Sequence, residues 1–294
     1  MSIRWGVSPI AWSNDDMPEL GGDTPLEDIF RDIREIGFEG VELGGRFPKE
    51  PAELQAMLGG LDLIGGWYSG SLLAQDAEAE IAALQPNLAL LKAMGSTVFV
   101  FAETSNAIHG ARAVPMSSAP RLAPDGWTEF GARLTVVADY IQSQGLRFAY
   151  HHHLGTVVET AADLDAFIAN TGSSVGLTLD TGHAALGGVN SLAIIRDHPE
   201  RVAHVHCKDV RWETFAKVKA AGSSFLDGVL FGMFTVPGDG GIDYAEIMQA
   251  LRRIDYSGWI VIEAEQDPAL ADPREYAALG LKTLKDRASA AGLT

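Results

Sequence analysis

The stretch Gly176–His183 reads Gly-Leu-Thr-Leu-Asp-Thr-Gly-His, and it decides the fold of this chain. The apolar run Val175–Leu179 is followed by a carboxylate, a tight turn and a histidine. Apolar runs of this length between turn residues are typical of strands buried on both faces, as in a parallel sheet. An unpaired carboxylate is very costly inside such a strand, so we expect Asp180 at the end of the strand.

Three other segments repeat this pattern of an apolar strand that ends in a histidine or an acid. They are Phe148–His153, Val202–Asp209 and Trp259–Glu265. Four successive strands therefore end in His, Asp, His and Glu. Mixed imidazole and carboxylate ligands suit a divalent ion such as Mn²⁺, Co²⁺, Fe²⁺ or Zn²⁺. The sequence thus predicts a metal site where these strand ends meet.

Apolar runs alternate with amphipathic segments along the whole chain, which is the signature of repeated βα units. Eight such units predict an α/β fold, a (β/α)8 TIM barrel formed by residues 1–294 as a single domain. Pro86 lies inside the expected third helix and should kink or restart it. The expected strands are Ile3–Ser8, Glu39–Leu43, Leu61–Tyr68, Thr97–Phe101, Phe148–His153, Val175–Leu179, Val202–Asp209 and Gly258–Ile262.

Two longer segments between these elements are expected to shape the site. A loop of about two dozen residues follows Thr97–Phe101 and is long enough for a lid or a wall. A second segment, about residues 211–241, is inserted between the seventh strand and the seventh helix and is rich in apolar residues. The sequence leaves three roles open for this segment: a satellite cluster under a loop, a dimer contact or a cover for the site.

The composition limits the partners and the location of the protein. The formal net charge of −17 argues against a nucleic-acid partner, because such binding depends on Lys and Arg. The single cysteine, Cys207, cannot form an internal disulfide, which is consistent with a reducing compartment. The N-terminus lacks the features of a signal peptide, and there is no apolar run of about 18 residues. These features predict a soluble, cytoplasmic protein without a membrane partner.

In a TIM barrel the active site lies at the carboxyl ends of the strands. Alternation along the fifth strand points His151 and His153 into the barrel mouth and turns His152 away. By the same rule Cys207 faces away from His206, and no G-x-S-x-G elbow is present, so nucleophilic catalysis is not expected. The side chains expected at the strand ends are Trp12, Asn14, Glu42, Trp67, Tyr68, Glu103, His151, His152, His153, Asp180, His183, His204, His206, Lys208, Asp209, Glu263 and Glu265.

Each of these residues also has a purely structural explanation. A single histidine at a strand end is usually a hydrogen-bonded wall residue, and Glu42 would accept backbone N–H groups in its own loop. Lys208 and Asp209 would pair with each other at the rim, and the aromatic residues would only pack. Glu265 would be either a solvated carboxylate or one that supports the ligands without binding the metal. The metal explanation is favoured because four strands share the pattern.

Several motifs resemble the xylose-isomerase-like TIM-barrel superfamily, which holds sugar epimerases, hydroxypyruvate isomerases, dehydroshikimate dehydratases and an endonuclease branch. The resemblance rests on Leu-Asp-Thr-Gly-His, His-Val-His-Cys-Lys-Asp and Val-Ile-Glu-Ala-Glu. Further stretches are similar to the dehydratase branch of myo-inositol catabolism, and they cover nearly the whole chain. These stretches are Trp5–Thr24, Gly40–Gly45, Gly65–Gly70, Tyr150–Thr156, Phe234–Gly240 and Glu263–Pro268.

This resemblance implies a metal centre formed by Asp180, His206, Glu263 and one histidine of the fifth strand. His151 stands where the superfamily usually has a ligand glutamate, and His153 stands where it has a histidine. His151 is therefore assigned as the ligand, and His153 is the alternative. The resemblance further implies Mn²⁺ or Co²⁺ as the ion and a requirement for glutathione.

The activity that the resemblance implies is that of a hydro-lyase acting on a small polyol ketone. It would convert 2-keto-myo-inositol (scyllo-inosose) to a trihydroxycyclohexane-1,2-dione through a metal-stabilised enolate. A histidine with a pKa near the working pH suits the proton steps. The candidate catalytic residues are His153, His183 and Lys208. The candidate substrate-binding residues are Trp12, Asn14, Glu42, Trp67 and Glu103.

Three other functions are compatible with parts of this pattern. A ketose epimerase or isomerase would share the enolate and the metal but return the proton elsewhere. A non-catalytic polyol-binding protein would bind without turnover. An abasic-site endonuclease is disfavoured by the negative charge of the chain. The sequence leaves the oligomeric state open, a homo-oligomer included.

Overall fold

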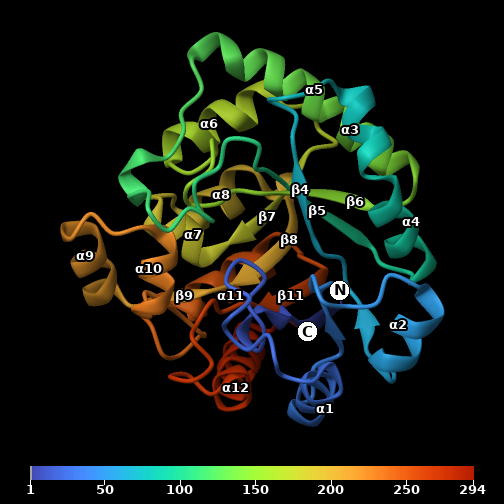
Figure 1. Ribbon diagram of the computed structural model, residues 1–294, viewed down its shortest axis with the longest axis vertical. Coiled ribbons are helices and arrows are strands. Elements are labelled where there is room, and N and C mark those ends of the chain that lie inside the picture. The colour runs from blue at the N-terminus through green and yellow to red at the C-terminus, as the bar shows by residue number, and fades with distance from the viewer. Residues whose placement is uncertain (1) are drawn as a thin grey trace.

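The computed structural model describes residues 2–294, and its centre is a ring of parallel strands surrounded by helices (Figure 1). The strands are hydrogen-bonded in the order β3-β2-β1-β11-β8-β7-β6-β5-β4. They are β1 (Ile3–Val7), β2 (Gly40–Val41), β3 (Asp62–Leu63), β4 (Trp67–Gly70), β5 (Val98–Glu103), β6 (Arg147–His151), β7 (Gly176–Asp180), β8 (Val202–Cys207) and β11 (Gly258–Ile262). The prediction of a TIM barrel is therefore confirmed.

The ring closes through β3 and β4, which are two pieces of one barrel strand. β3 pairs with β2, and β4 pairs with β5 on the other side. The residues between the pieces stay in the ladder, since the N–H of Leu43 donates to the carbonyl of Gly65 at 2.8 Å. The expected strand Leu61–Tyr68 is thus present but interrupted.

Helices surround the ring, as the alternation predicted. They are α1 (Leu26–Ile36), α2 (Pro51–Leu58), α3 (Ala77–Ala83), α4 (Gln85–Ala93), α5 (Pro124–Ser143), α6 (Ala161–Asn170), α7 (Thr181–Leu186), α8 (Ser191–Asp197), α9 (Trp212–Ala220), α10 (Phe225–Leu230), α11 (Tyr244–Arg253) and α12 (Pro273–Ala291). The third expected helix restarts at Pro86, which lies in the first turn of α4. None of the helices formed by residues 2–294 is both long and apolar enough to span a membrane.

The expected tight turn between Asp180 and His183 is wrong, because the helix α7 begins directly after Asp180. Asp180 is the N-cap of this helix, and its Oδ1 accepts the backbone N–H of His183 at 2.8 Å. An N-cap carboxylate satisfies an amide that would otherwise lack a partner, which favours helix formation here. Oδ1 of Asp180 therefore caps the helix, and Oδ2 is left available to bind a ligand in the site.

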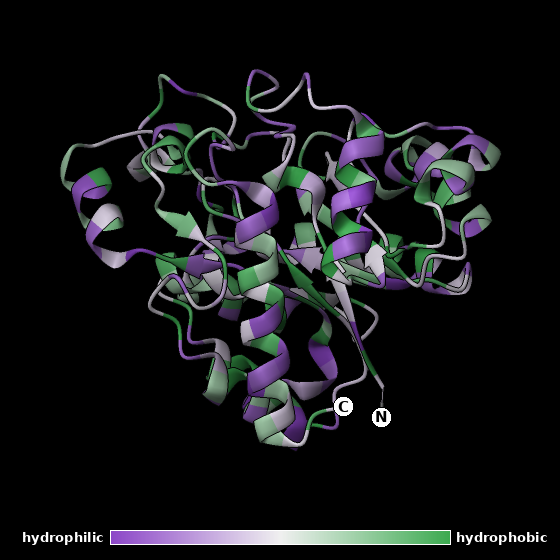
Figure 2. Cartoon of the chain, turned by 90° about the horizontal axis from the view of Figure 1, so that it is seen from below, coloured by the Kyte–Doolittle hydropathy of each residue, from purple (hydrophilic) through white to green (hydrophobic). Residues whose placement is uncertain are grey.

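Apolar residues form two separate clusters, one inside the barrel and one between the sheet and the helices. A small cluster inside the ring includes Val98, Val100, Ala149 and Trp259. Trp259 is close to Gly40, where an added Cβ would lie 2.7 Å from the indole ring. The helices cover the outside with their apolar faces, and Figure 2 shows hydrophilic and hydrophobic residues on the same helices. The carboxyl ends of the strands are left to polar side chains.

The insertion after β8 forms a small lobe beside the ring (Figure 1). It contains α9, α10 and the short strand β10 (Phe234–Thr235), which pairs antiparallel with β9 (Asp209–Val210). The expected strand Val202–Asp209 is therefore shorter than predicted and ends at Cys207. Phe225 and Met233 belong to a cluster of their own with Met17 and Leu154, which confirms the satellite-cluster reading. The lobe also covers the site, since the ring of Phe225 lies 5.0 Å from that of His153.

Candidate metal centre and substrate cavity

Four side chains from neighbouring barrel strands meet at the carboxyl ends of those strands. They are His151 at the end of β6, Asp180 at the end of β7, His206 in β8 and Glu263 directly after β11. One possible ligand atom from each lies within 4.8 Å of all the others. All four side chains are buried. These are the four residues that the sequence predicted as metal ligands.

Hydrogen bonds from the opposite ring nitrogens orient the two imidazoles. Nδ1 of His151 lies 2.8 Å from the carbonyl oxygen of His152 and must donate to it, which leaves the lone pair on Nε2. Nε2 of His206 lies 2.9 Å from Oε1 of Glu42, so Nδ1 of His206 faces the acids Asp180 and Glu263. An imidazole held by a carbonyl or carboxylate on its far nitrogen is the usual arrangement of a metal-ligating histidine.

The residues of this group fit a divalent cation. Oδ2 of Asp180 is buried and has no hydrogen-bond partner within residues 2–294, whereas Nδ1 of His206 contacts the carboxylate of Glu263. Burial, together with the charge of Glu263, raises the pKa of Asp180 to about 6, although Lys208 opposes this shift. A buried carboxylate oxygen without a donor is costly, and a cation would satisfy it. The mixed oxygen and nitrogen donor set suits a first-row divalent metal.

Glu42 supports this group from the neighbouring strand β2. Its Oε1 accepts hydrogen bonds from both His204 and His206, at 2.8 and 2.9 Å. Burial would raise the pKa of Glu42, but the charge of His206 and the two hydrogen bonds outweigh it and lower the pKa to about 2. The alternative that Glu42 only accepts backbone N–H groups of its loop is therefore wrong.

Lys208 is fully buried and links the metal group to a second acid. Its ammonium lies 2.8 Å from Oε1 of Glu263, 2.8 Å from Oε2 of Glu265 and 2.9 Å from Nε2 of His183. Three neighbours match the three N–H donors of an ammonium group. Burial lowers the pKa of Lys208, but the nearby carboxylates outweigh it and raise the pKa, so the ammonium stays charged. The alternative that Lys208 and Asp209 only pair with each other at the rim is therefore wrong. Glu265 is buried and supports Lys208, so of its two structural alternatives only the solvated one is wrong.

Replacing Lys208 with Met should strongly destabilise the fold. The change leaves the buried carboxylates of Glu263 and Glu265 without their cation, and breaking a buried ion pair from one side costs about 3–5 kcal/mol. The midpoint and slope of urea unfolding measure this loss. Lys282→Met is the matched control, because that lysine is exposed and pairs only with Asp286 on the surface. Equal midpoints for the two variants would contradict the role of Lys208.

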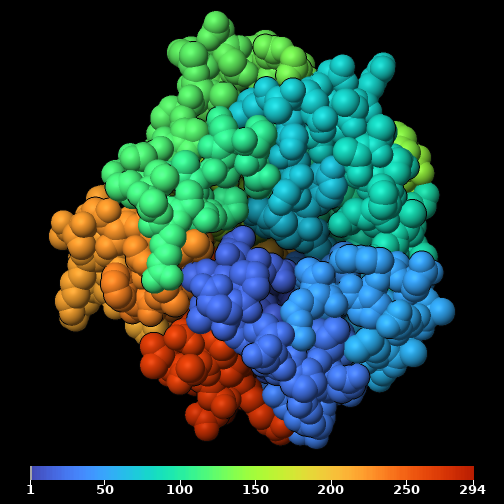
Figure 3. All heavy atoms as spheres, in the orientation of Figure 1, coloured from blue at the N-terminus to red at the C-terminus, as the bar shows by residue number. Residues whose placement is uncertain are grey.

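A cavity of about 440 Å³ opens at this end of the barrel, within the usual range for small-molecule sites. Figure 3 shows a hollow in the same face, beside the segment that follows β1. The cavity reaches two of the four candidate ligands, His206 and Glu263, so a molecule bound in it would contact a metal held there. Its lining residues are Ser8, Pro9, Ile10, Asp15, Asp16, Glu42, Leu43, Gly44, Gly45, Lys49, Trp67, Asn87, Val100, His109, His153, His206, Glu263 and Glu265.

The cavity includes some predicted substrate-binding residues and leaves out others. Glu42 and Trp67 line it. Trp12 instead donates its indole N–H to Asp32 at 3.3 Å, and Oδ1 of Asn14 accepts the N–H groups of residues 16 and 17. Glu103 accepts the N–H groups of residues 73 and 105. These contacts explain Trp12, Asn14 and Glu103 structurally, so their substrate-binding role stays a prediction that the cavity lining does not support.

The rings of the two predicted catalytic histidines, His153 and His183, pack against each other at an angle of 37° with centroids 3.8 Å apart, but only His153 lines the cavity. Nδ1 of His153 donates to the carbonyl of Leu154 at 2.7 Å, so the lone pair is on Nε2. Burial, with the charges of His109, His151 and Lys208, holds the pKa of His153 well below its usual range. His183 lies behind it, with its ring nitrogens beside Lys208 and the N–H of Leu154.

The sequence did not predict several polar residues of the cavity wall. Asp15 and Asp16 follow the first strand, and Lys49 follows the second. Asn87 lies in α4, and His109 lies in the long loop between β5 and α5. The length of that loop predicted a wall or lid, but a loop has no side-chain periodicity that would single out a residue.

The chain belongs to the xylose isomerase-like TIM barrel family, whose model matches residues 27–287. Among its relatives is the "Rhizopine catabolism protein MocC" of Rhizobium meliloti, 44% identical over 99% of this chain and 90% of that protein. An "Inosose dehydratase" of Geobacillus thermodenitrificans is 38% identical over 94% of both chains. Another of the same name, from Bacillus licheniformis, is 39% identical over 95% of this chain and 94% of its own.

Solved structures with the same fold are more distant in sequence. A xylose isomerase domain protein from Alicyclobacillus acidocaldarius superimposes with a TM-score of 0.70 at 19% identity, over 99% of this chain and all of the other. An L-ribulose 3-epimerase gives a TM-score of 0.69 at 18% identity, over 99% of this chain and 96% of its own. These likenesses independently support the barrel architecture.

Proposed function

We propose that the chain is a metal-dependent hydro-lyase that removes one molecule of water from 2-keto-myo-inositol and yields a trihydroxycyclohexane-1,2-dione. The relatives named inosose dehydratase support an enzyme of the hydro-lyase class in inositol catabolism. The observation that carries the proposal is the group His151, Asp180, His206 and Glu263 at the edge of a cavity of suitable size. Mn²⁺ or Co²⁺, a glutathione requirement, a cytoplasmic location and the oligomeric state stay predictions.

In this proposal His151, Asp180, His206 and Glu263 hold the divalent ion. When bound, the ion would supply Lewis-acid polarisation of the substrate ketone, which makes the neighbouring C–H more acidic. His153 faces the cavity with an unprotonated Nε2, accepts that proton and returns it to the departing hydroxyl, which leaves as water. His183 does not line the cavity, so it acts on the substrate only through the ring of His153.

Other residues of the site exclude water and hold the charged groups in place. Trp67 packs edge-on against both His151 and His153, with ring centroids 5.2 and 5.5 Å apart. Lys208 fixes the carboxylate of Glu263 through a 2.8 Å contact. Rigid support of this kind holds reacting groups in a productive geometry.

Turnover of inosose by the metal-loaded protein in D₂O tests this proposal. We expect a product that is lighter than the substrate by one water, seen by mass spectrometry and by new absorbance from a conjugated or enolised dione. The competing function is a ketose epimerase, which uses the same acidified C–H but expels no hydroxyl. Deuterium at a carbon of a product that retains every hydroxyl would refute the dehydratase and support the epimerase.

A further inference from the structure

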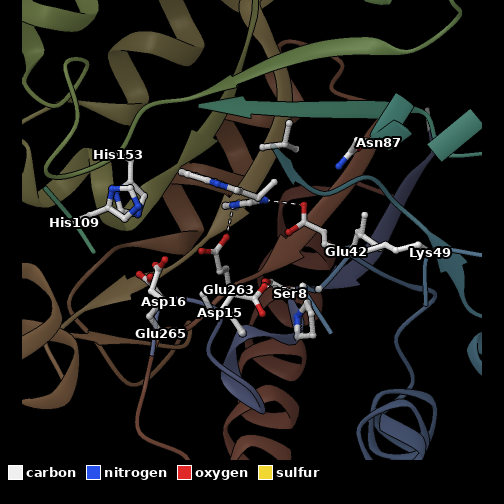
Figure 4. Close-up of a pocket in the computed structure, with 18 residues that line it drawn as sticks. Ser8, Asp15, Asp16, Glu42, Lys49, Asn87, His109, His153, Glu263 and Glu265 are labelled. Carbon is white, nitrogen blue, oxygen red and sulfur yellow. Dashed lines mark hydrogen bonds and ion pairs between the residues drawn. The ribbon is translucent and has the colours of Figure 1, made fainter. Parts of the chain in front are cut away.

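The long loop between β5 and α5 delivers one polar side chain to the cavity, that of His109. Nδ1 of His109 is buried, and no residue in the described part of the chain, 2–294, forms a hydrogen bond with it. A buried ring nitrogen that is left unpaired costs stability unless another molecule satisfies it. Figure 4 shows His109 beside His153 on one side of the cavity, with Glu263 between them and Glu42.

The packing around His109 holds the imidazole ring in place. The ring lies 4.9 Å from His153, 6.2 Å from Trp67 and 6.4 Å from Phe225, as measured between centroids. Its neighbours come from β4, the end of β6 and the lobe after β8, which are far apart in sequence. Since several elements converge on this ring, the position of Nδ1 is set by the fold rather than by a free loop.

The backbone of His109 is held as closely as its ring. The N–H of Ile108 donates to the carbonyl of Gly155 at 2.8 Å. Gly155 has φ +79°, and an added Cβ there would lie 3.0 Å from the backbone N of His109. A glycine is therefore required for this close approach. Farther along, Arg112 pairs with Asp227 of the lobe at 3.0 Å, so the loop is also attached to the lobe.

A residue on the opposite side of the cavity also has a buried polar atom without a hydrogen-bond partner among residues 2–294. The side chain of Asn87 lines the cavity, and its Oδ1 is this buried atom. Figure 4 shows Asn87 and Lys49 on the side away from His109 and His153. A ligand that satisfies both atoms must carry polar groups on opposite sides, as a ring with several hydroxyl groups does.

We propose that His109 is a specificity-determining residue whose Nδ1 forms a hydrogen bond with a ring hydroxyl of a cyclic polyol. This inference rests on the proposed function only in that the polyol is an inositol derivative. It assigns substrate recognition, and not proton transfer, to His109. A site built to bond a hydroxyl rejects the analogue that lacks it, because the buried protein atom is then left unpaired. The site would therefore bind polyols that carry this hydroxyl more tightly than the analogues that lack it.

The test compares three substitutions that treat the two ring nitrogens differently. His109→Phe keeps the packing and removes both nitrogens, His109→Asn places a polar atom near the position of Nδ1, and His109→Gln places one near Nε2. Calorimetry with the Mn²⁺-loaded protein measures the Kd of myo-inositol, which has no ketone and is not turned over, and of its monodeoxy analogues. His198→Phe is the control, since His198 follows α8 outside the cavity lining.

We expect one monodeoxy analogue to bind the wild type about fivefold more weakly than myo-inositol does, as one hydrogen bond is worth about 1 kcal/mol. In His109→Phe this difference should vanish, because both ligands then bind equally weakly. His109→Asn should restore the difference, and His109→Gln should not. A purely structural role for His109 would weaken all ligands alike and would not distinguish Asn from Gln.

The inference is overturned if His109→Phe discriminates between the ligands as the wild type does. If the wild type does not bind myo-inositol, the same comparison on kcat/KM for inosose and its deoxy analogues decides, and the absence of any discrimination also overturns it. A wild type that shows the expected pattern but releases no water would refute the proposed hydro-lyase and leave the role of His109 intact. If the protein releases water but shows no discrimination between the ligands, the hydro-lyase proposal stands and the role of His109 is refuted.

Discussion

Replacing Asp180 with Asn is expected to abolish both metal binding and turnover. Oδ2 of Asp180 has no hydrogen-bond partner within residues 2–294 and lies 3.7 Å from His151 and 3.7 Å from His206. The Asn side chain keeps the size of the residue and its cap on α7 but removes the negative charge that would bind the cation. Loss of a supporting contact around a metal typically costs 10–100-fold, so loss of a direct ligand should lower affinity and rate by more than about 100-fold.

Metal content after dialysis and the rate of water release from inosose measure this effect. Asp243→Asn is the matched control, because Asp243 also caps a helix, α11, through its Oδ1 but lies outside the metal group. It should keep its metal and its rate. A fully metal-loaded Asp180→Asn variant would show that Asp180 is not a ligand.

The barrel and the four candidate ligands could be predicted because both depend on short local patterns. A buried strand must be apolar until it reaches the end of the sheet, so a charged residue such as Asp180 or Glu263 marks that end. In a parallel barrel all these ends lie on one face. Position along the chain is therefore enough to bring His206 and Glu263 together, without knowledge of any long-range contact.

Alternation along the strand could not decide between His151, the assigned ligand, and His153, because it places both on the same face. The structure separates them by their neighbours. Nε2 of His151 lies 3.7 Å from Oδ2 of Asp180, whereas His153 groups with His183 and Glu265. The difference arises because β6 ends at His151, so His153 lies beyond the strand, just before the turn at Leu154, and lines the cavity.

The supporting contacts of the site were also beyond the sequence pattern. The structural alternative for Lys208 was a pair with its neighbour Asp209, but these two side chains have different partners. Asp209 instead accepts the N–H groups of residues 210 and 242, in the loop region around Gly240. The partners of Lys208 lie in α7, directly after β7, and in the segment after β11, and their distances from it depend on the register of the closed barrel. Local spacing carries no information on that register.

Replacing His153 with Gln is expected to lower the rate of water release by about 10²–10⁴-fold, as is typical for the loss of a general acid or base. Nδ1 of His153 is committed to the carbonyl of Leu154, so Nε2 is the nitrogen that accepts the proton. The amide of Gln lies near that position but cannot take up a proton. Metal content should be unchanged, since His151 rather than His153 belongs to the group with Asp180.

Two further measurements separate this catalytic role from a structural one. His153→Ala leaves a space in the cavity wall, and added imidazole should restore part of the rate if a ring nitrogen is all that is missing. KM for inosose should change much less than kcat, because the proton is transferred only in the chemical step. Loss of the metal from His153→Gln would instead make His153 the fourth ligand, and it would move the proton-accepting role to another group of the cavity.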